Sequence, residues 1–349
     1  MKIIHFVRHF HPRLGGVEKH VYNVIQEQMR QGLEVDVITW QYENMLCYEN
    51  YKGINIYRSP ALRSPLRNCL WHLKYLHKYI TSDVLHFHNL DSFEYIPFLV
   101  FLKSKIVLTL HGWGGKFPIP EKDKIRVKTV SERYASRIIT VGHFVNKWYG
   151  IKSDAVIYGA VDDQLFTENK SAKIYDICVF GRLESDAGIT LYKDALEELI
   201  KLTGGKIKIC IVGDGSMKES LLKSLVGAEI NYVGFVKNTQ QYLEQSKICF
   251  TSGYLGILEC LAAQTKVCSV YDNQLKEDYL RLSPYADYIY ITNNKDELIK
   301  QVLYNLSNDD ESLPPVPNPI KDLNWSNLIE VYRKEYAQVL LDRTSKLKT

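Results

Sequence analysis

Two series of short apolar runs, each followed by longer amphipathic stretches, set the strongest limit on how this chain folds. Such alternation is typical of β-α-β units on a parallel sheet. The first series begins at Lys2–Val7 and the second at Tyr175–Phe180. A chain of 349 residues is also long enough for two domains of ordinary size. The sequence therefore predicts an α/β protein with two Rossmann-like, doubly wound domains.

A polar run at Thr167–Ser171 marks the expected seam between the two domains. Closely spaced prolines at Pro314, Pro315, Pro317 and Pro319 form an extended link to a last helix, which we expect at Trp325–Leu341. The predicted divisions are residues 1–165, residues 166–320 and residues 321–349.

Composition and charge exclude several classes of protein. A net charge of +4 gives no concentrated basic stripe, so we expect no nucleic-acid partner. The seven cysteines are scattered and never form a CxxC pair, which indicates free thiols in a reducing compartment. The apolar stretch Ile96–Leu110 is interrupted by Lys103, Ser104 and Lys105 and is too short to span a bilayer. We therefore expect a cytoplasmic protein that does not cross the membrane.

Ligands of open α/β sheets bind beyond the carboxyl ends of the strands, so the residues that follow each strand are the candidates. In the first domain, Gly15-Gly16-Val17-Glu18 opens a helix whose free amides suit an anion, although many such turns bind nothing. His86 and His88 end a later strand, with Asp83 before them. Because they alternate on a strand, both rings point the same way. With no third ligand evident, packing or substrate contact is favoured over a metal site.

In the second domain, the region Phe250–Glu259 is the strongest local feature. A strand there ends in a glycine-bounded turn, and the next helix carries Glu259 about one turn inside. Arg182 follows the first strand of this domain. Its planar guanidinium can bind two oxygens of a diphosphate at once, although a surface arginine without a ligand is an equally good interpretation of this residue alone. The loops around Gly213 and Gly234-Phe235-Val236 follow two further strands and offer backbone groups to a nucleobase.

Taken together, these residues resemble glycosyltransferase family 4, a group of retaining enzymes with the two-domain GT-B fold. The resemblance follows the family's order through nearly the whole chain. It rests on Gly15-Gly16-Val17-Glu18, Asp83–His88, Thr109-Leu110-His111-Gly112, Ala160-Val161-Asp162 with Phe166, Gly181-Arg182-Leu183, Val212–Gly215, Gly234-Phe235-Val236, Leu258-Glu259, and Trp325 with Tyr332.

The resemblance implies transfer of a hexose-type sugar from a nucleotide-sugar donor to a glycan or lipid-linked acceptor. It also implies that the last helix returns to the first domain and that the two domains face a cleft. His111 would lie near the donor sugar, Arg182 would stabilise the diphosphate leaving group, and Glu259 would bind the ribose. The other implied donor contacts are Gly15, Gly16, Gly181, Gly213, Phe235, Val236, Gly253, Tyr254, Leu255, Gly256 and Ile257, and the implied acceptor-side residues are Glu18, His86 and His88.

Two positions depart from the family's pattern. Thr251 stands where the family usually has a second glutamate, and Ala187 stands where it usually has a lysine. The missing lysine removes one of two cations from the leaving group, and Lys193, Lys237 and Lys266 are the candidates to replace it. These departures keep open a GT-B protein without catalysis that serves as a binding or partner subunit. A nucleotide-sugar epimerase on the same fold is the other alternative.

No Asp-x-Asp motif or metal-ligand cluster is evident, so we expect neither a metal nor another cofactor. A dinucleotide-dependent oxidoreductase is disfavoured because Gly-x-Gly-x-x-Gly is absent after the first strand. Residues 63–79 combine basic side chains with Trp and Leu, a pattern typical either of contact with an anionic membrane or of a surface helix with one buried face. Contact with the membrane would make the protein peripheral on its inner face.

Overall fold

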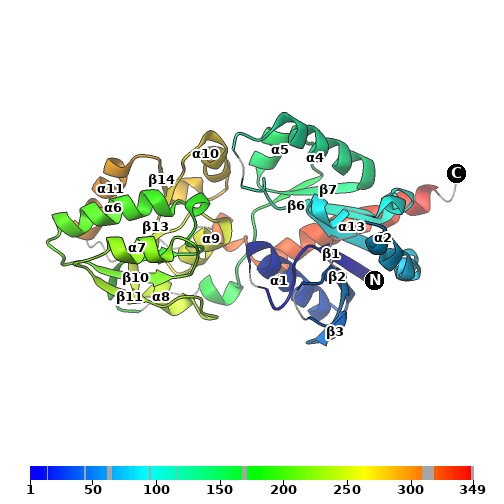
Figure 1. Cartoon of the computed structure of the whole chain (residues 1–349), viewed down its shortest axis with the longest axis horizontal. Helices are drawn as coiled ribbons and strands as arrows, with labels where there is room; N and C mark the ends of the chain where they lie inside the picture. The colour runs from blue at the N-terminus through cyan, green and yellow to red at the C-terminus, as the bar shows by residue number, and fades with distance from the viewer. Residues whose placement is uncertain are drawn as a thin grey trace. The chain divides into compact units, whose positions relative to one another are not determined.

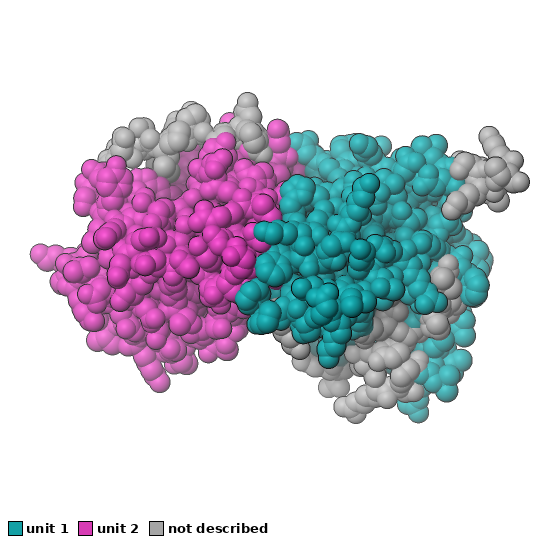
Figure 2. Space-filling view, turned by 90° about the horizontal axis from the view of Figure 1, so that it is seen from above, with its two compact units in different colours: residues 1–157, 325–349 teal, residues 158–324 magenta. Residues whose placement is uncertain are grey.

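The computed structural model in Figure 1 describes residues 1–13, 15–42, 45–60, 65–93, 96–115, 117–166, 171–308 and 318–346. Figure 2 colours its two compact units separately: unit 1 comprises residues 1–157 and 325–349, and unit 2 comprises residues 158–324. No helix among the described residues is both long enough and apolar enough to cross a bilayer.

The first unit ends earlier than residue 165, because the segment after residue 157 packs on unit 2. Val161 forms an isolated parallel bridge with Asn324 and donates from its amide to the oxygen of Leu323 at 3.0 Å. Gly159 lies directly against the side chain of Leu255. The predicted linker residues 167–170 and prolines 314, 315 and 317 lie outside the described residues.

Unit 1 is built on an eight-stranded sheet with the order β3-β4-β2-β1-β5-β6-β7-β8. All neighbouring strands are parallel except the β3–β4 hairpin, which the sequence analysis did not predict. Its turn places Lys52 and Gly53 at positive φ, 51° and 85°. The strands are β1 (Lys2–Val7), β2 (Glu34–Trp40), β3 (Tyr48–Tyr51), β4 (Ile54–Ser59), β5 (Val84–His88), β6 (Ile106–Leu110), β7 (Arg137–Val141) and β8 (Ala155–Ile157).

Helices cover both faces of this sheet. On one face, Val21 and Ile25 of α1 pack against Val7, Val35 and Val37 of the strands. On the other face, the ring of Phe6 stacks on Phe87 at 4.0 Å and meets Tyr79 edge-on. The helical segments of unit 1 are α1 (Gly16–Arg30), α2 (Pro65–Lys74), α3 (Leu76–Thr81), η1 (Leu90–Phe93), η2 (Pro97–Lys105), α4 (Glu121–Tyr134), α5 (His143–Tyr149) and α13 (Trp325–Lys346).

The last helix returns to unit 1, as the resemblance implied. α13 packs beside α1 and over β6, as can be followed in Figure 1. Tyr332 and Tyr336 are fully buried there. The helix runs to Lys346, beyond the predicted end at Leu341.

Unit 2 is built on a six-stranded, wholly parallel sheet with the order β11-β10-β9-β12-β13-β14. The strands are β9 (Tyr175–Phe180), β10 (Lys208–Val212), β11 (Glu229–Tyr232), β12 (Ser246–Phe250), β13 (Lys266–Val270) and β14 (Tyr290–Thr292). The helical segments are η3 (Asp163–Phe166), η4 (Ser185–Ala187), α6 (Ile189–Leu202), α7 (Lys218–Ser224), α8 (Gln240–Glu244), α9 (Tyr254–Ala262), α10 (Gln274–Arg281), η5 (Ala286–Tyr288), α11 (Lys295–Ser307) and α12 (Asn318–Lys321).

The two faces of the unit 2 sheet have different side chains because successive strand residues alternate between faces. Ile177 and Val179 of β9 join the apolar core beneath α6, α7 and α11. Cys178 lies between them in sequence and is level with Cys210 and Cys249 on the neighbouring strands. All seven cysteines are free thiols, as predicted. Burial and neighbouring thiols hold the pKa of Cys249 well above its usual range, so this group is inert packing.

Each sheet has one switch point, where the chain leaves one side of the first strand and continues on the other. In unit 1 it lies between β1 and β5, and in unit 2 between β9 and β12. Ligands of doubly wound sheets bind at such points, beyond the carboxyl ends of the strands.

Candidate functional site

The switch point of unit 2 brings together the loops that follow β9, β10 and β12. The amide of Gly181 donates to Val212 at 3.0 Å, and the amide of Gly213 donates to Gly234 at 2.9 Å. A Cβ on Gly213 would overlap the main-chain oxygen of Gly181, so only glycine fits there. Both amides are therefore engaged, and these two predicted donor residues shape the loop edge.

Arg182 stands at the carboxyl end of β9, beside this edge. It is exposed, and its guanidinium donates to Asp186 at 2.8 Å. The side chain of Thr251, which replaces the family's glutamate, lies between this loop edge and α9, because its Oγ1 would be 3.9 Å from a Cβ on Gly181 and 2.6 Å from one on Gly256. Arg182 is thus an accessible cation next to a small, buried hydroxyl.

The first turn of α9 provides backbone donors, but fewer than predicted. The amide of Tyr254 donates to the hydroxyl of Tyr279 at 2.7 Å, and the amide of Ile257 donates to Gly253 at 2.9 Å. First-turn amides have no acceptor within their own helix. The amides of Leu255 and Gly256 are therefore the ones suited to an anion, and Tyr254 and Ile257 are not.

Glu259 is 7% exposed on α9 and accepts a hydrogen bond from Thr239 Oγ1 at 3.1 Å. This contact supplies a partner that a buried carboxylate needs. Phe235 is exposed in the loop after β11, immediately after Gly234, and Val236 follows it half-buried. The carboxylate of Glu259 thus lies on the helix after β12, and the exposed ring of Phe235 lies in the loop after β11.

Lys276 is a site residue that the sequence analysis missed. It is 5% exposed, and Nζ donates to the main-chain oxygen of Asp186, the residue before Ala187. Burial holds the pKa of Lys276 below its usual value, although Asp186 and Asp272 oppose this fall, and Arg182 adds to it. No sequence motif marks Lys276 as a site residue, because it lies 90 residues from Asp186 in the sequence and only the folding of α10 brings the two together.

Unit 1 contains a cavity of about 700 Å³ beyond the carboxyl ends of β1, β5 and β6. This volume suits a sugar-sized ligand. Its lining includes Arg8, Asn89, Asp91, His111, Trp113 and Arg126.

Two side chains fix the shape of this cavity's wall. Asn89 adopts a left-handed conformation with φ 66°, and its Oδ1 accepts from the amide of His111 at 2.7 Å. Arg8 pairs with Asp91 at 3.3 Å. His111, the predicted catalytic histidine, therefore stands in the cavity wall on an anchored main chain.

The glycine turn at the start of α1 has a carboxylate folded onto it. The side chain of Glu18 lies directly against Gly15, whereas nothing crowds Gly16. Burial raises the pKa of Glu18, and Asp91 adds to the rise while Arg13 opposes it. Gly16 is the open backbone position of the pair.

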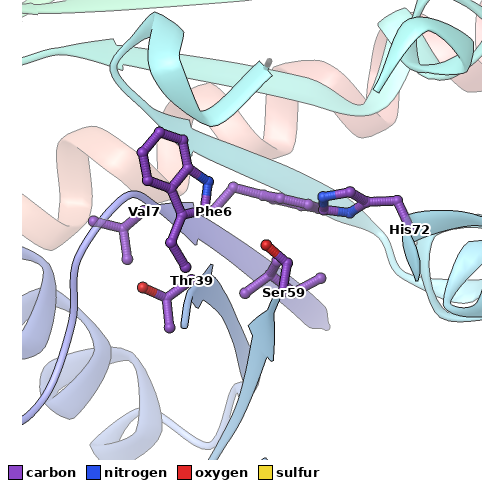
Figure 3. Close-up of a pocket in the computed structure, with 7 residues that line it drawn as sticks. Phe6, Val7, Thr39, Ser59 and His72 are labelled. Atoms are coloured by element: carbon purple, nitrogen blue, oxygen red, sulfur yellow. The ribbon is translucent and has the colours of Figure 1, made fainter. Parts of the chain in front are cut away.

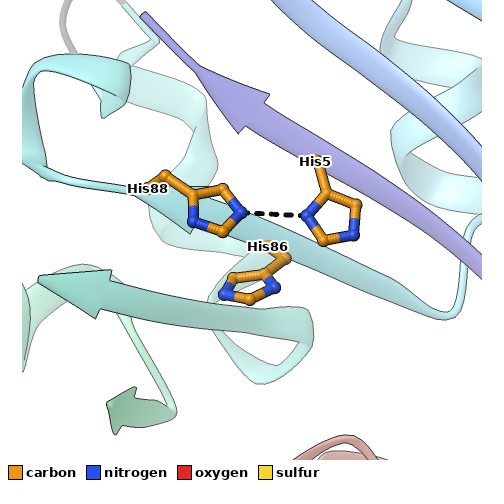
Figure 4. Close-up of side chains that lie close together, drawn as sticks. All are labelled: His5, His86 and His88. Carbon is orange, nitrogen blue, oxygen red and sulfur yellow. Dashed lines mark hydrogen bonds between the residues drawn. The ribbon is translucent and has the colours of Figure 1, made fainter. Parts of the chain in front are cut away.

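His86 and His88 lie in the protein interior. Both are buried and joined by a third histidine, His5 of β1, as Figure 4 shows. The expectation that no third ring is present was wrong. Facing ring nitrogens of these three residues lie within 4.8 Å of one another, which would suit a metal.

Hydrogen bonds nevertheless account for all six ring nitrogens of this trio. The partners are Gln28, His111, Tyr336, Thr109 and the histidines themselves. Lone pairs engaged in this way do not converge on an ion. The trio therefore does not fit a metal, and neither His86 nor His88 has an exposed nitrogen for an acceptor.

A second cavity, shown in Figure 3, lies at the ends of β2 and β4 in unit 1. Its volume is about 10 Å³, and Phe6, Thr39, Ser59 and His72 are among its lining residues. This space holds about one water molecule, so it is no substrate site.

Solved structures with the same architecture cover nearly the whole chain. A glycosyltransferase from Rickettsia africae shares 15% identity and a TM-score of 0.70, over 97% of this chain and 98% of that one. Anabaena HepE in complex with UDP shares 14% identity and a TM-score of 0.67, over the full length of both chains. The lipopolysaccharide outer core galactosyltransferase WaaB shares 14% identity and a TM-score of 0.68, over 98% of this chain and 100% of that one. The chain therefore has the GT-B fold.

Sequence comparison gives matches to glycosyltransferases. The model of Glycosyltransferase Family 4 matches residues 14–165, which lie mostly in unit 1. A GDP-mannose:cellobiosyl-diphosphopolyprenol alpha-mannosyltransferase of Xanthomonas oryzae is 31% identical over 125 residues. That alignment spans 32% of this chain and only 31% of the relative's length. An uncharacterized glycosyltransferase of Methanocaldococcus jannaschii is 25% identical over 76% of this chain and 80% of its own.

Proposed function

We propose that this protein is a retaining glycosyltransferase that moves a hexose-type sugar from a nucleotide sugar to a glycan or lipid-linked acceptor. The observation that carries the proposal is the switch point of unit 2, where Arg182, the first-turn amides of α9 and Glu259 surround the ends of β9 and β12. Related proteins support a nucleotide-sugar donor, since HepE is solved with UDP-glucose and the Xanthomonas relative is named for GDP-mannose.

The donor's diphosphate would lie between Arg182 and the amides of Leu255 and Gly256. As the bond from the sugar to the diphosphate breaks, negative charge grows on the departing oxygen. Positioned cations and backbone donors stabilise that charge in the transition state. Lys276 would add a second positive charge beneath the loop, in place of the lysine missing at Ala187. This scheme requires no metal ion.

The nucleoside would extend along the ends of β10 and β11. Glu259 would accept from the ribose hydroxyls in addition to Thr239. The base would lie near Phe235 and Val236, where an exposed ring and main-chain groups are available.

We place the acceptor in the unit 1 cavity, whose wall includes His111. Trp113 offers a flat ring of the kind that stacks on sugars, and Arg8 and Arg126 add positive charge to the wall, which suits an acidic or phosphorylated acceptor. A lipid-linked acceptor accords with the polyprenol-linked substrate for which the Xanthomonas relative is named.

Helix α2 supports a peripheral contact with an anionic membrane, through the residues 63–79 singled out above, of which Arg63 lies outside the described residues. Its buried side is polar, with Asn68 and His72 facing the protein. Its outer side is apolar, because Leu66, Leu70 and Leu73 are exposed by 70%, 56% and 44%. A helix that presents leucines outward beside the exposed Arg67 and Lys74 suits a negatively charged bilayer. The protein would then work at the cytoplasmic face.

The first experiment is thermal unfolding of the purified protein with UDP, GDP, ADP and their sugar conjugates. Wild type should be stabilised by one nucleotide, and Glu259→Ala should lose the shift. Glu198→Ala, on α6, is the matched control and should keep it. If no nucleotide stabilises the folded wild type, the donor-site assignment is wrong and a non-catalytic partner subunit becomes the better explanation.

A further inference from the structure

Histidines crowd one buried face of the unit 1 sheet, where an apolar core is the norm. His5 pairs in register with His86 on the adjacent strand, and His88 lies two residues further along. The rings of His5 and His88 are nearly parallel, with centroids 5.2 Å apart, and Figure 4 shows them side by side, joined by the hydrogen bond between their facing nitrogens. Three imidazoles side by side are an unusual core, and the pairing of their nitrogens determines which of them donate and which accept.

A continuous chain of hydrogen bonds connects α1 to the wall of the unit 1 cavity. Oε1 of Gln28 lies 2.8 Å from Nε2 of His5, and Nδ1 of His5 lies 2.9 Å from Nε2 of His88. Nδ1 of His88 then lies 2.9 Å from Nε2 of His111. The chain thus begins at a fully buried amide and ends at the residue that lines the cavity.

All the imidazoles in this chain are neutral at neutral pH. Burial lowers the pKa of His5 to about 4. Burial and the neighbouring imidazoles hold the pKa of His88 and of His111 well below their usual range. A neutral imidazole has one N–H donor and one nitrogen lone pair, so each ring must donate at one end and accept at the other.

The amide oxygen of Gln28 gives this chain its direction, because a carbonyl oxygen only accepts. His5 must donate from Nε2 to Gln28, which leaves Nδ1 of His5 as an acceptor. His88 must then donate from Nε2 to His5, and His111 must donate from Nε2 to His88. The nitrogen left with a lone pair is Nδ1 of His111.

The nitrogen of the same amide sets a second branch. Nε2 of Gln28 donates to the hydroxyl of Tyr336 at 3.1 Å, and that hydroxyl lies 2.7 Å from Nδ1 of His86. The other nitrogen of His86 lies 2.8 Å from Thr109 Oγ1. Gln28 therefore contacts both branches, of which only the first reaches His111.

We propose that Gln28, His5 and His88 are positioning residues that hold His111 in the Nε2–H tautomer, with Nδ1 presented as an acceptor for a sugar hydroxyl. This inference rests on the proposed function, because it assigns His111 a substrate contact. Without this chain of hydrogen bonds, the neutral imidazole of His111 exchanges between its two tautomers, and one of them has a donor at Nδ1 instead of an acceptor. The hydrogen bonds thus select which polar group His111 offers to the substrate.

The direct test is ¹⁵N-detected NMR of the histidine side chains at pH 7, which reports the protonated nitrogen of each ring. Wild type should show His111 protonated at Nε2 and unprotonated at Nδ1. His88→Phe and Gln28→Leu should each give a mixture of tautomers at His111. His72→Phe is the matched control, since His72 is also buried in unit 1 but bonds Tyr79 and lies outside the chain.

Sugar transfer gives the second readout. We expect His88→Phe and Gln28→Leu to lower kcat about tenfold, as the loss of one oriented hydrogen bond does, and to leave the Kd of the nucleotide unchanged. Gln28 lies on another element from His88, so one variant remains informative if the other fails to fold.

The two proposals fail separately. The tautomer is measured without substrate, so absence of nucleotide binding would overturn the proposed function and leave this result standing. Detection of His111 protonated at Nδ1 in wild type, or an unchanged tautomer in both variants, would overturn the positioning role even with transfer intact.

Discussion

Lys276 on α10 donates a hydrogen bond from its ammonium to the main-chain oxygen of Asp186, whose carboxylate holds Arg182. The arrangement places a buried cation beneath the loop that lacks the family's lysine at Ala187. Two of the three replacements expected from the sequence lie elsewhere. Lys266 begins β13, at the amino end of the strand, and Lys193 pairs with Asp194 and Glu197 on α6.

We expect Lys276→Met to weaken binding of the nucleoside diphosphate about tenfold, since one charge interaction with phosphate is lost. Isothermal titration calorimetry measures this directly. Lys266→Met, at the opposite edge of the sheet, should bind as wild type does. Equal affinity in the two variants would show that Lys276 is a structural cation without a part in donor binding.

Two glycines at the same sheet edge should respond differently to alanine. Gly213 has φ 147°, and its Cβ would overlap the oxygen of Gly181, whereas Gly253 has φ −105° and open space around it. Gly213→Ala should lower the free energy of unfolding by about 2–4 kcal/mol, because it combines backbone strain with a clash. Gly253→Ala should lose less than about 0.5 kcal/mol. Urea denaturation at pH 7 separates these outcomes, and comparable losses would mean that the loop relaxes around a new side chain.

Local sequence patterns predicted the strands and loops that carry the proposed donor site. The first strand of each domain was placed at the residues the structure shows, because buried parallel strands are short apolar runs with few alternatives. The helix predicted after the glycine-bounded turn is α9, and it carries Glu259 as expected. Arg182 lies just after β9 and Glu259 lies on α9, so the position of each follows from the strand that precedes it in the sequence.

Contacts between distant elements could not be predicted from these patterns. The His86–His88 pair was identified, but its third member, His5, belongs to no motif and joins them only because β1 pairs with β5. Residues 63–79 left two interpretations open for another reason. The leucine spacing of α2 indicates an apolar face, and in the structure that face is exposed. Hydrophobic periodicity gives the direction of an apolar face and does not say whether protein or lipid covers it.

The exposed leucine face of α2 allows a direct test of membrane contact. Leu70→Glu and Leu73→Glu should each reduce binding to vesicles with anionic lipid about tenfold or more, since each removes a side chain whose burial contributes about 1.5–3 kcal/mol. Their thermal unfolding should match wild type, because both side chains are already exposed. Leu202→Glu, exposed on α6 of unit 2, is the control. Equal sedimentation of all three variants with vesicles would exclude α2 as the contact.

The buried histidines should make the stability of unit 1 steeply dependent on pH. Burial lowers the pKa of His5 and His20 from 6.5 to about 4 and that of His72 to about 3. The unfolded chain therefore binds more protons than the folded one once the pH falls below about 6.5. The free energy of unfolding should be unaffected by these groups above that pH, and should fall from pH 6.5 down to about pH 4.

At pH 5, each such imidazole should cost about 2 kcal/mol of stability relative to pH 7. Urea denaturation of wild type and His5→Phe at both pH values measures the contribution of one ring. The variant starts less stable, because Gln28 and His88 lose their partner, but its loss between pH 7 and pH 5 should be smaller by that amount. His77→Phe alters an exposed ring on α3 and should keep the wild-type slope. An unchanged slope in His5→Phe would mean that the buried rings take up protons in the folded state, and that the neutral hydrogen-bond chain leading to His111 does not exist at pH 5.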